Sequence, residues 1–302
     1  MIALLAPGQG SQAPGMLTSW LELDGVAARI ERYSAASGLD LARLGTTAEA
    51  EEITDTAIAQ PLIVTATLLG YEHSGELPAD GPTAGHSVGE LAAAAIAGVI
   101  GEEDAVALAA ARGREMAAAC ALEPTGMAAV MGGEQAELLD ALPGLDLIPA
   151  NQNGAGQLVV AGALDKLEQL AEQRPGGVRV KQLQVAGAFH TKYMAPAQEA
   201  FAKHAEQVEV RDPVRPLLSN LDGTVVTSGD EFRRRLIEQI TAPVRWDLCM
   251  ETLGAQGISA AIEFPPAGPL TGLIKRTLKE VARFQMKQPD AEGIAEFVRV
   301  NA

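Results

Sequence analysis

Hydrophobic and polar positions along the first part of the chain follow a strand period and then a helix period. Residues 2–6, IALLA, form a short apolar run that stops at PGQG, which predicts a buried strand entering a turn. Apolar positions at helical spacing predict helices at about 16–36 and 57–70. Pro61 is expected in the first turn of the second helix, where a missing N–H is tolerated.

The same kind of pattern returns further along the chain. The segment GPTAGH, residues 81–86, leads into a serine turn, and two helices are predicted after it, at about 88–97 and 102–121. A strand, a turn and successive helices are typical of an α/β fold.

Shorter strands and helices are predicted over about residues 124–187. Their order is strand, helix, strand, strand, helix, strand, from the segments GMAAVMG, EQAELLDAL, LDLIPA, QLVVAG, ALDKLEQLAEQ and VRVKQLQV. This βαββαβ order is that of a ferredoxin-like unit. We therefore predict a small inserted domain at 124–187.

Longer units follow the predicted insert. Helices are expected around 194–207, 229–240 and 246–255, together with strand-like RPLLSN and AAIEF and a helix over LTGLIKRTLKEVA. The simplest architecture is a discontinuous α/β core, made of residues 1–123 and 188–302, that carries the insert. A cleft is expected between the two.

Composition and charge narrow the class of protein. A chain of 302 residues with 47% hydrophobic content can bury one large domain, or a large domain with a smaller insert. The formal net charge of −16 argues against nucleic acid as a partner. Cys120 and Cys249 lie far apart, with no CxxC pair and no His-Cys cluster, so we expect core thiols and no metal site.

The apolar runs bear on location and assembly. The start, MIALLAPGQG, has no basic residue before an apolar run that is too short for a signal peptide. The longest run, LAAAAIAGVI at 91–100, is about half of what a bilayer span requires. We expect a cytoplasmic protein without membrane insertion. No long apolar stripe is left for an obligate interface, so a monomer is expected.

A serine between two glycines is the first candidate for chemistry. Gly85, Ser87 and Gly89 form G-x-S-x-G, in which the missing Cβ atoms permit a sharp strand-to-helix turn that exposes the serine hydroxyl. The N–H groups of the following helix could hold an oxyanion there. Five residues alone leave a nucleophile and an ordinary turn serine equally open.

A nucleophilic serine needs a base, and the chain has four histidines. His86 adjoins Ser87 and should point away from it, so a structural role is expected. His73, in a polar loop, and His204, on a helix surface, are expected to be solvated. His190 lies where the insert returns to the core, and is therefore the best candidate for the base.

Five separated motifs carry a family resemblance. They are GHSVGE at 85–90, PGQGSQ at 7–12, AFHTKYM at 188–194, PVRW at 243–246 and EFPPAGPLTGLIKR at 263–276. In this order they resemble the malonyl-CoA:acyl carrier protein transacylases, the acyltransferases of fatty acid synthesis. The resemblance implies a hydrolase-like α/β core, with a mostly parallel sheet, and a ferredoxin-like insert.

The resemblance also implies a mechanism and the residues that perform it. Ser87 attacks the thioester of malonyl-CoA, His190 accepts its proton, and the malonyl-serine ester passes to the phosphopantetheine thiol of acyl carrier protein in ping-pong fashion. The backbone N–H groups of Gln9 and Val88 hold the oxyanion. The backbone carbonyl of Gln239 orients the histidine in place of an aspartate.

Substrate-binding residues follow from the same resemblance. Composition alone favours a helix-surface charge for Arg112, whereas its spacing from Ser87 matches the family arginine that binds the malonate carboxylate through two parallel hydrogen bonds. Phe189 matches the bulky residue that favours malonyl over methylmalonyl groups. Gln60, Asn151 and Asn153 match polar positions of the cleft, although a turn or cap role for the asparagines remains open.

The resemblance implies no metal, nucleotide or redox cofactor, because coenzyme A and the carrier arm are substrates. Acyl carrier protein is acidic, so this acidic chain needs a local positive rim around its cleft. The candidates for the rim are Lys181, Lys192, Arg233, Arg234, Arg235, Lys275 and Arg276.

Two other functions remain open. A serine hydrolase of esters or thioesters would use the same Ser87 and His190, but Arg112 counts against it for neutral acyl groups. A carrier-protein docking component with an inactive site would not need the intact set of Gly85, Ser87, Gly89, Arg112 and His190.

Overall fold

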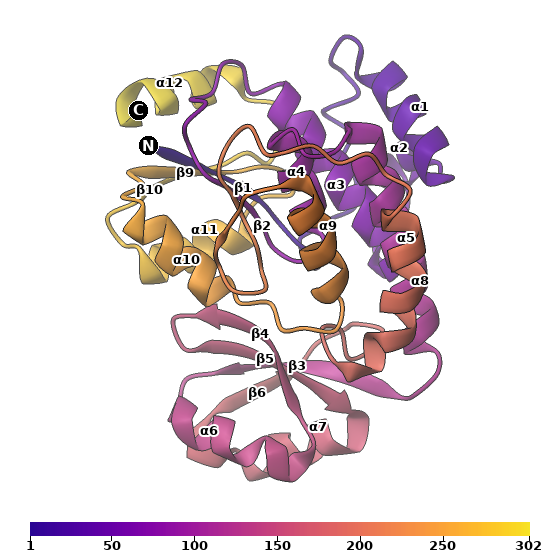
Figure 1. Ribbon diagram of the computed structural model, residues 1–302, viewed down its shortest axis with the longest axis vertical. Helices are drawn as coiled ribbons and strands as arrows, with labels where there is room; N and C mark the ends of the chain where they lie inside the picture. Colours follow the sequence, from indigo (N-terminus) through magenta and orange to yellow (C-terminus); the bar gives the residue numbers. More distant parts are fainter.

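Two separate β-sheets organise the chain, which the computed structural model describes over residues 1–302 (Figure 1). The larger has six strands in the order β10-β9-β1-β2-β7-β8, and all neighbours are parallel except β7 and β8. Its strands are β1 (Ile2–Ala6), β2 (Thr83–Gly85), β7 (Leu217–Leu218), β8 (Val225–Val226), β9 (Ala260–Glu263) and β10 (Ala282–Gln285). The α/β class predicted from the sequence is confirmed.

The central strand β1 is buried on both faces, as its unbroken apolar sequence predicts. Ile2, Leu4 and Ala6 face one hydrophobic cluster, and Ala3 and Leu5 face another. The first face is covered by α1 (Val26–Ser37), α2 (Leu41–Thr46), α3 (Thr56–Glu72), α4 (Gly89–Ile96), α5 (Glu102–Cys120), α8 (Ala195–Ala205), α9 (Gly229–Glu238) and α12 (Ala291–Asn301). The second face is covered by α10 (Trp246–Ala255) and α11 (Pro269–Thr277).

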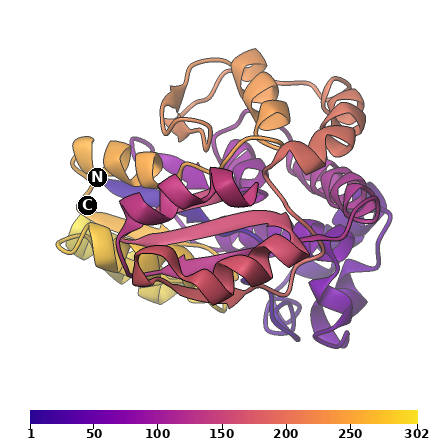
Figure 2. The ribbon, with the colours of Figure 1, turned by 90° about the horizontal axis from the view of Figure 1, so that it is seen from below.

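The smaller sheet is antiparallel, with the order β4-β5-β3-β6, and lies below the core in Figure 1. Its elements are β3 (Thr125–Met131), α6 (Gln135–Ala141), β4 (Ile148–Gly154), β5 (Gln157–Ala163), α7 (Leu164–Gln173) and β6 (Arg179–Gln182). Helices α6 and α7 cover the face turned away from the core, in front of the sheet in Figure 2. The βαββαβ order of elements matches the prediction.

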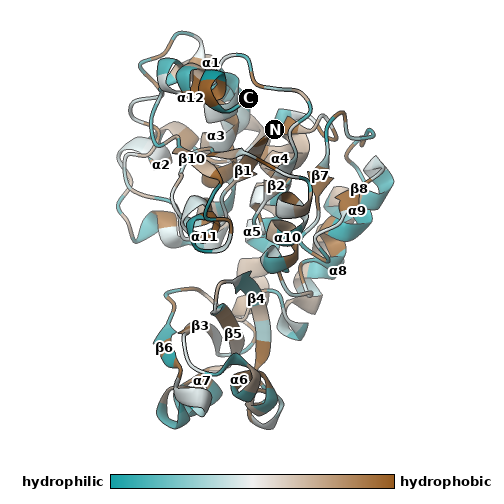
Figure 3. Ribbon diagram, turned by 90° about the vertical axis from the view of Figure 1, so that its left-hand side faces the viewer, coloured by the Kyte–Doolittle hydropathy of each residue, from teal (hydrophilic) through white to brown (hydrophobic).

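Alternation along β3 and β5 divides their side chains between two environments. Val130 and Val160 pack against α6 and α7, whereas Met127 and Val159 belong to the large core cluster. Figure 3 shows β5 as strongly apolar and β4 as largely polar. The apolar strands of the small sheet therefore contribute one wall to the space between the two sheets.

Strand β4 is hydrogen-bonded to the core. The Val244 N–H donates to the Ala150 carbonyl at 2.8 Å, and the Gln152 N–H donates to the Val244 carbonyl at 2.9 Å. At the junction between the sheets, the Ala188 N–H donates to the Thr125 hydroxyl at 3.0 Å. The small sheet is thus attached to the core at two separate points.

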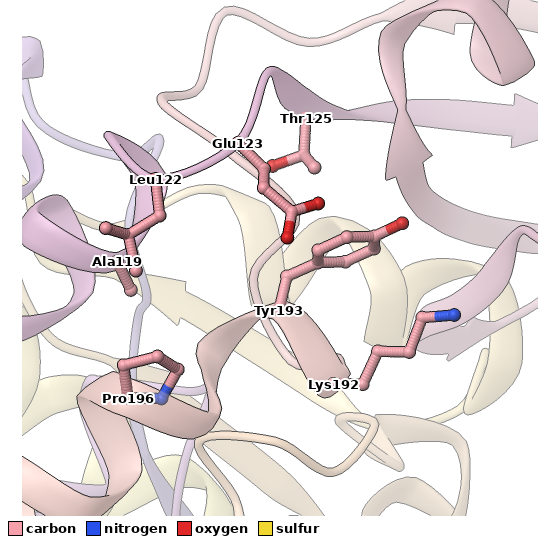
Figure 4. Close-up of a pocket in the computed structure, with 7 residues that line it drawn as sticks. All are labelled: Ala119, Leu122, Glu123, Thr125, Lys192, Tyr193 and Pro196. Atoms are coloured by element: carbon pink, nitrogen blue, oxygen red, sulfur yellow. The ribbon is translucent and has the colours of Figure 1, made fainter.

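A hollow of about 460 Å³ lies at the same junction (Figure 4). Glu123, on the segment that enters the small sheet, and Tyr193, on the segment that leaves it, both line the hollow. The Lys192 ammonium bonds to Asp146, in the turn before β4, at 2.9 Å. The lining residues are Ala119, Leu122, Glu123, Thr125, Lys192, Tyr193 and Pro196. None of the helices combines the length and the apolar character that a membrane span needs.

Three predictions of secondary structure are wrong in detail. The first helix begins at Val26 and not near residue 16, because Gly25, with a φ of +81°, interrupts the preceding turns. Pro61 lies beyond the first turn of α3, since Asp55 caps that helix by accepting from the Ala57 N–H. The last predicted helix ends at Thr277, and the strand β10 and the helix α12 that follow were not predicted.

The start of α11 depends on a buried carboxylate at the end of β9. Glu263 accepts from the N–H groups of Leu270 and Thr271 at 3.0 and 2.8 Å, and from the Thr271 hydroxyl at 2.7 Å. These N–H groups have no partner within the helix. Glu263 therefore ties α11 to the end of the central sheet.

We predict that Glu263→Ala lowers the free energy of unfolding by about 3 kcal/mol, because it leaves buried donors without an acceptor. The measurement is urea unfolding monitored by circular dichroism. Glu280→Ala, at an exposed glutamate nearby, is the control and should change stability by less than about 0.5 kcal/mol. Equal effects of the two substitutions would contradict the role of Glu263.

Candidate active site

Ser87 lies in a strained turn between β2 and α4. Its φ is +54°, in the left-handed region that side chains other than glycine seldom adopt. A Cβ on Gly85 would collide with the backbone of Gly89 and Glu90, and a Cβ on Gly89 would collide with the Ala6 carbonyl. The two glycines are therefore required by close backbone contacts, as the G-x-S-x-G pattern predicts.

Ser87 is hydrogen-bonded to His190. The Ser87 hydroxyl donates to His190 Nε2 at 2.8 Å, and His190 Nδ1 donates to the Gln239 carbonyl at 3.0 Å. A carbonyl oxygen only accepts, so Nδ1 carries the proton, and the Gln239 amide nitrogen at 3.0 Å from Nδ1 is not its acceptor. This arrangement leaves Nε2 free to accept the serine proton.

Burial controls the protonation of His190. Desolvation, with the positive charge of Arg112 nearby, lowers the pKa of His190 to about 3, against the opposing effect of the Gln239 carbonyl. The imidazole is therefore neutral at neutral pH. A neutral imidazole is the form that can act as a base.

Arg112 extends from α5 into the same space. It is 1% exposed. One terminal nitrogen donates to Gln60 Oε1 at 2.8 Å, and the other donates to the Ser87 hydroxyl at 3.2 Å and to Gln239 Oε1 at 3.3 Å. Desolvation lowers the pKa of Arg112 to about 10, so the guanidinium stays charged.

No carboxylate of the chain forms an ion pair with Arg112. Its Nε is buried without an acceptor. A buried guanidinium that lacks a counter-ion is costly unless an anion binds it. The site is therefore suited to an anionic group a few ångströms from the serine.

Two backbone N–H groups next to Ser87 have no hydrogen-bond partner in the protein, those of Gln9 and Val88. Gly8 permits this approach, because a Cβ there would lie 2.6 Å from the His86 carbonyl. The Gln9 side chain donates to Thr56 at 3.1 Å, which holds the loop that follows β1. Both N–H groups are available for an oxyanion formed at Ser87.

These groups border a cavity of about 90 Å³ between the two sheets. Ser87, Val88, Gln9, Arg112 and His190 are joined there by the predicted residues Gln60, Phe189 and Asn151, together with His86, Met116, Met127, Val159, Leu183 and Val185. A second hollow of about 270 Å³ shares Gln9, His86, Asn151, Val159 and Leu183 with the cavity and extends to Arg276 on α11. The hollow of Figure 4 shares no lining residue with either.

Asn153 does not reach the cavity around Ser87. Its Oδ1 lies 3.0 Å from His86 Nε2, and the His86 ring packs against Trp246 with ring centroids 5.6 Å apart. Both asparagines lie in β4, so the alternative of a turn or cap role is wrong for each. His86 bonds to Asn153 and not to the Ser87 hydroxyl, but it also lines the cavity, so its structural role stays a prediction.

The other two histidines lie away from Ser87. His204 lies on the surface of α8, as predicted, but is only half-buried rather than fully solvated, and its Nε2 is 3.5 Å from Glu115. His73 is not solvated as expected, because Nδ1 lies 2.9 Å from the Leu69 carbonyl and its ring contacts Trp20 edge to face. It sits at the end of α3, where its ring nitrogen bonds to the same Leu69 carbonyl that accepts from its backbone N–H.

Comparison with known proteins agrees with this geometry. The family model described as the acyl transferase domain matches residues 4–297. The malonyl CoA-acyl carrier protein transacylase of Mycobacterium tuberculosis strain H37Rv is 57% identical over 96% of this chain and 97% of that protein. The chain belongs to the malonyl CoA-acyl carrier protein transacylase family.

Two solved structures of such transacylases have the same fold. The crystal structure of MCAT from Mycobacterium tuberculosis gives a TM-score of 0.94 at 56% identity, covering 98% of this chain and 99% of that one. A malonyl-transacylase in complex with a type II PKS acyl-carrier protein gives a TM-score of 0.91 at 28% identity, covering 100% and 99%.

Two buried residues of this transacylase-family site, Glu90 and Asn220, were not predicted from the sequence. The Asn220 amide bonds to the backbone at Ser87 and Gly85, and its N–H bonds to Glu90. A carboxylate directly before the alanine-rich run at 91–100 was the one sequence signal for Glu90. Asn220 had none, because it lies 133 positions from Ser87 along the chain.

On the acid side of its pH profile, Ser87 loses reactivity as His190 becomes protonated. We predict that Arg112→Met raises the pH midpoint of this loss by about one unit, because the cation of Arg112 lowers the pKa of His190. The measurement is the rate of inactivation by a neutral fluorophosphonate as a function of pH. Arg114→Met, at an exposed arginine of the same helix, is the control. An unchanged midpoint in Arg112→Met would contradict the coupling between Arg112 and His190.

Proposed function

We propose that the protein transfers the malonyl group of malonyl-CoA to the phosphopantetheine thiol of an acyl carrier protein, through a malonyl ester on Ser87. The observation that carries the proposal is Arg112, a buried cation without a counter-ion, 3.2 Å from the nucleophile. The activity supplies malonyl units for fatty acid synthesis, which is the role of the family.

In the first half-reaction, the Ser87 oxygen attacks the thioester carbonyl as its proton passes to His190 Nε2. The N–H groups of Gln9 and Val88 hold the oxyanion of the tetrahedral intermediate. The intermediate collapses with cleavage of the carbon–sulfur bond, and the coenzyme A thiolate takes the proton from His190. The malonyl-serine ester remains.

The second half-reaction reverses the first with a different thiol. The carrier thiol gives its proton to His190, and its sulfur attacks the ester carbonyl. Collapse breaks the ester bond, and the Ser87 oxygen recovers the proton from His190. The Gln239 carbonyl keeps the imidazole in the tautomer that both halves need.

Arg112 selects the acyl group. The two terminal guanidinium nitrogens, which now bond to Ser87, Gln60 and Gln239, can bind the free malonyl carboxylate through two parallel hydrogen bonds. A hydrolase of neutral esters gains nothing from such a group, which supports the transferase over the hydrolase. Gln60 orients the guanidinium by accepting from one of its terminal nitrogens.

The hollow that borders the Ser87 cavity at Gln9 and Asn151 and extends to α11 is the proposed route of the thiol arm. Of the predicted rim, Arg233, Arg234, Arg235 and Lys192 are paired with carboxylates. Lys181, Lys275 and Arg276 are exposed, and no carboxylate forms an ion pair with them. These three are the better candidates for an acidic carrier protein, and a related transacylase has been solved with its carrier.

The proposal also includes the domain boundaries, the location, the oligomeric state and the absence of a cofactor that the sequence predicts. We interpret residues 1–123 with 188–302 as a hydrolase-like catalytic core, and 124–187 as a ferredoxin-like domain, with the sheet order β4-β5-β3-β6 in support. We further propose a cytoplasmic monomer that uses no metal or other cofactor. Asn153 acts in it through His86, by orienting that ring beside the cavity.

We predict that malonyl-CoA adds a malonyl group to the wild type, and that Ser87→Ala abolishes the adduct. Arg112→Ala should reduce its formation at least about 100-fold, because the carboxylate loses a charge-assisted pair, whereas Arg114→Ala should leave it unchanged. The measurement is intact-mass spectrometry, before and after phosphopantetheinylated carrier protein is added.

Transfer of the malonyl group to the carrier supports the transacylase. Decay of the adduct to free malonate with the carrier present would favour a hydrolase. An absence of any adduct with any acyl-CoA would leave the docking component as the function.

Phe189 generates a prediction about selectivity. It is 6% exposed and lines the cavity beside His190, where its ring would crowd an α-methyl group. Phe189→Ala should raise kcat/KM for methylmalonyl-CoA relative to malonyl-CoA by about tenfold, since one methyl group accounts for a discrimination of that order. An unchanged ratio in competition assays would remove Phe189 as the determinant.

A further inference from the structure

Asn220 lies directly behind the Ser87 turn and bonds to both of its sides. Its Oδ1 accepts from the Ser87 N–H at 2.7 Å, and its Nδ2 donates to the Gly85 carbonyl at 2.8 Å. Asn220 is completely buried. One side-chain amide therefore bridges the residues before and after His86, across the bend itself.

The backbone of Asn220 is held as firmly as its side chain. Its N–H donates to Glu90 Oε1 at 2.8 Å, and its carbonyl accepts from the Arg245 N–H at 2.8 Å. Glu90 lies in the first turn of α4, the helix that follows Ser87. The acid and the amide thus connect the turn, the helix after it and the segment before α10 in one buried network.

The Ser87 turn needs such support. A residue at φ +54° relaxes to an ordinary conformation unless its surroundings prevent it. The N–H of Ser87 has no backbone acceptor, so Asn220 supplies its one partner. Any rotation of this peptide would also move the Ser87 hydroxyl away from His190 and re-aim the Val88 N–H.

We propose that Asn220, held by Glu90, is a positioning residue that keeps Ser87 in its reactive conformation. The proposal rests on the proposed function only for the identity of the acyl group. The bridge acts on the nucleophile and the oxyanion donors, and not on the Arg112 pocket. It therefore affects the rate of acylation and leaves substrate affinity nearly unchanged.

Glu90 is suited to hold Asn220 without adding charge at neutral pH. Its Oε2 is buried without a partner, and desolvation raises the pKa of Glu90 to about 8. The charged or titratable groups that face it are Arg112 of α5, Arg235 of α9 and Cys249 of α10. Above this pH the carboxylate adds a negative charge beside the site that binds an anion.

The first test compares Asn220→Ala with Thr252→Val. Thr252, in α10, is a matched control. Its hydroxyl donates at 2.7 Å to the carbonyl of Gly223, which lies in the same loop as Asn220, but it makes no bond to the Ser87 turn. The measurements are the rate of malonyl-enzyme formation by rapid quench and intact mass, the KM for malonyl-CoA, thermal melting, and inactivation by a neutral fluorophosphonate.

Asn220→Ala should slow both acylation and inactivation about 100-fold and change KM less than about threefold, at a melting temperature similar to that of Thr252→Val. Rates within about threefold of Thr252→Val would overturn the proposal. If the wild type formed no malonyl-enzyme but Asn220→Ala still slowed inactivation, the proposed function would fail and the positioning role would stand.

Three further variants test the amide bridge of Asn220 and its support by Glu90 separately. Asn220→Asp keeps the acceptor for Ser87 but replaces the donor to Gly85, and should be nearly as slow as Asn220→Ala. Glu90→Ala should slow acylation about tenfold, and Glu90→Gln, which retains an acceptor oxygen, should restore most of the rate at pH 7.

The pH dependence of the acylation rate distinguishes the proposed role of Glu90 from a purely structural role. Wild-type acylation should fall above about pH 8, as Glu90 ionises, whereas Glu90→Gln should stay level over the same range. The same fall in both proteins would remove Glu90 from the proposal. Full activity of Asn220→Asp would likewise overturn the role of the amide bridge.

Discussion

A serine held in a left-handed turn at the end of β2 is the constraint on which the site depends. The turn brings the backbone of β1, β2 and α4 so close together that Gly85 and Gly89 have no room for a side chain. It also turns the Ser87 hydroxyl and the Val88 N–H toward one point. The hydrogen bonds that join the Asn220 side chain to Ser87 and Gly85 offset the energetic cost of the strained backbone.

Burial lowers the pKa of both ionisable groups that meet Ser87 but leaves them in different charge states. It keeps His190 neutral and able to accept a proton, while Arg112 stays charged because its pKa starts so high. Each also affects the other, since a fixed positive charge disfavours protonation of the imidazole. A base and an anion-binding cation can therefore share one dry cavity without neutralising each other.

The two sheets contribute different residues to the site. The core supplies Ser87 from the end of β2, Arg112 from α5, and His190 from the segment that leads from the small sheet to α8. The antiparallel sheet supplies an apolar wall through Met127 and Val159, and a polar strand through Asn151. Because β4 is hydrogen-bonded to the core at Val244, that wall is held at a defined distance from Ser87.

Periodicity and short motifs are local properties, and they were enough to predict the α/β class, the βαββαβ order of elements and the candidate residues Ser87, His190 and Arg112, which the structure brings together. The predictions for Pro61, for the first and last helices and for Asn153 were wrong, because of the cap at Asp55, the turn at Gly25, the pairing of β10 with β9 and the bond from Asn153 to His86. Only the tertiary structure decided that Arg112 lacks a counter-ion and that Asn220 supports the turn. Those facts depend on which distant segments exclude water together, and no local pattern records that.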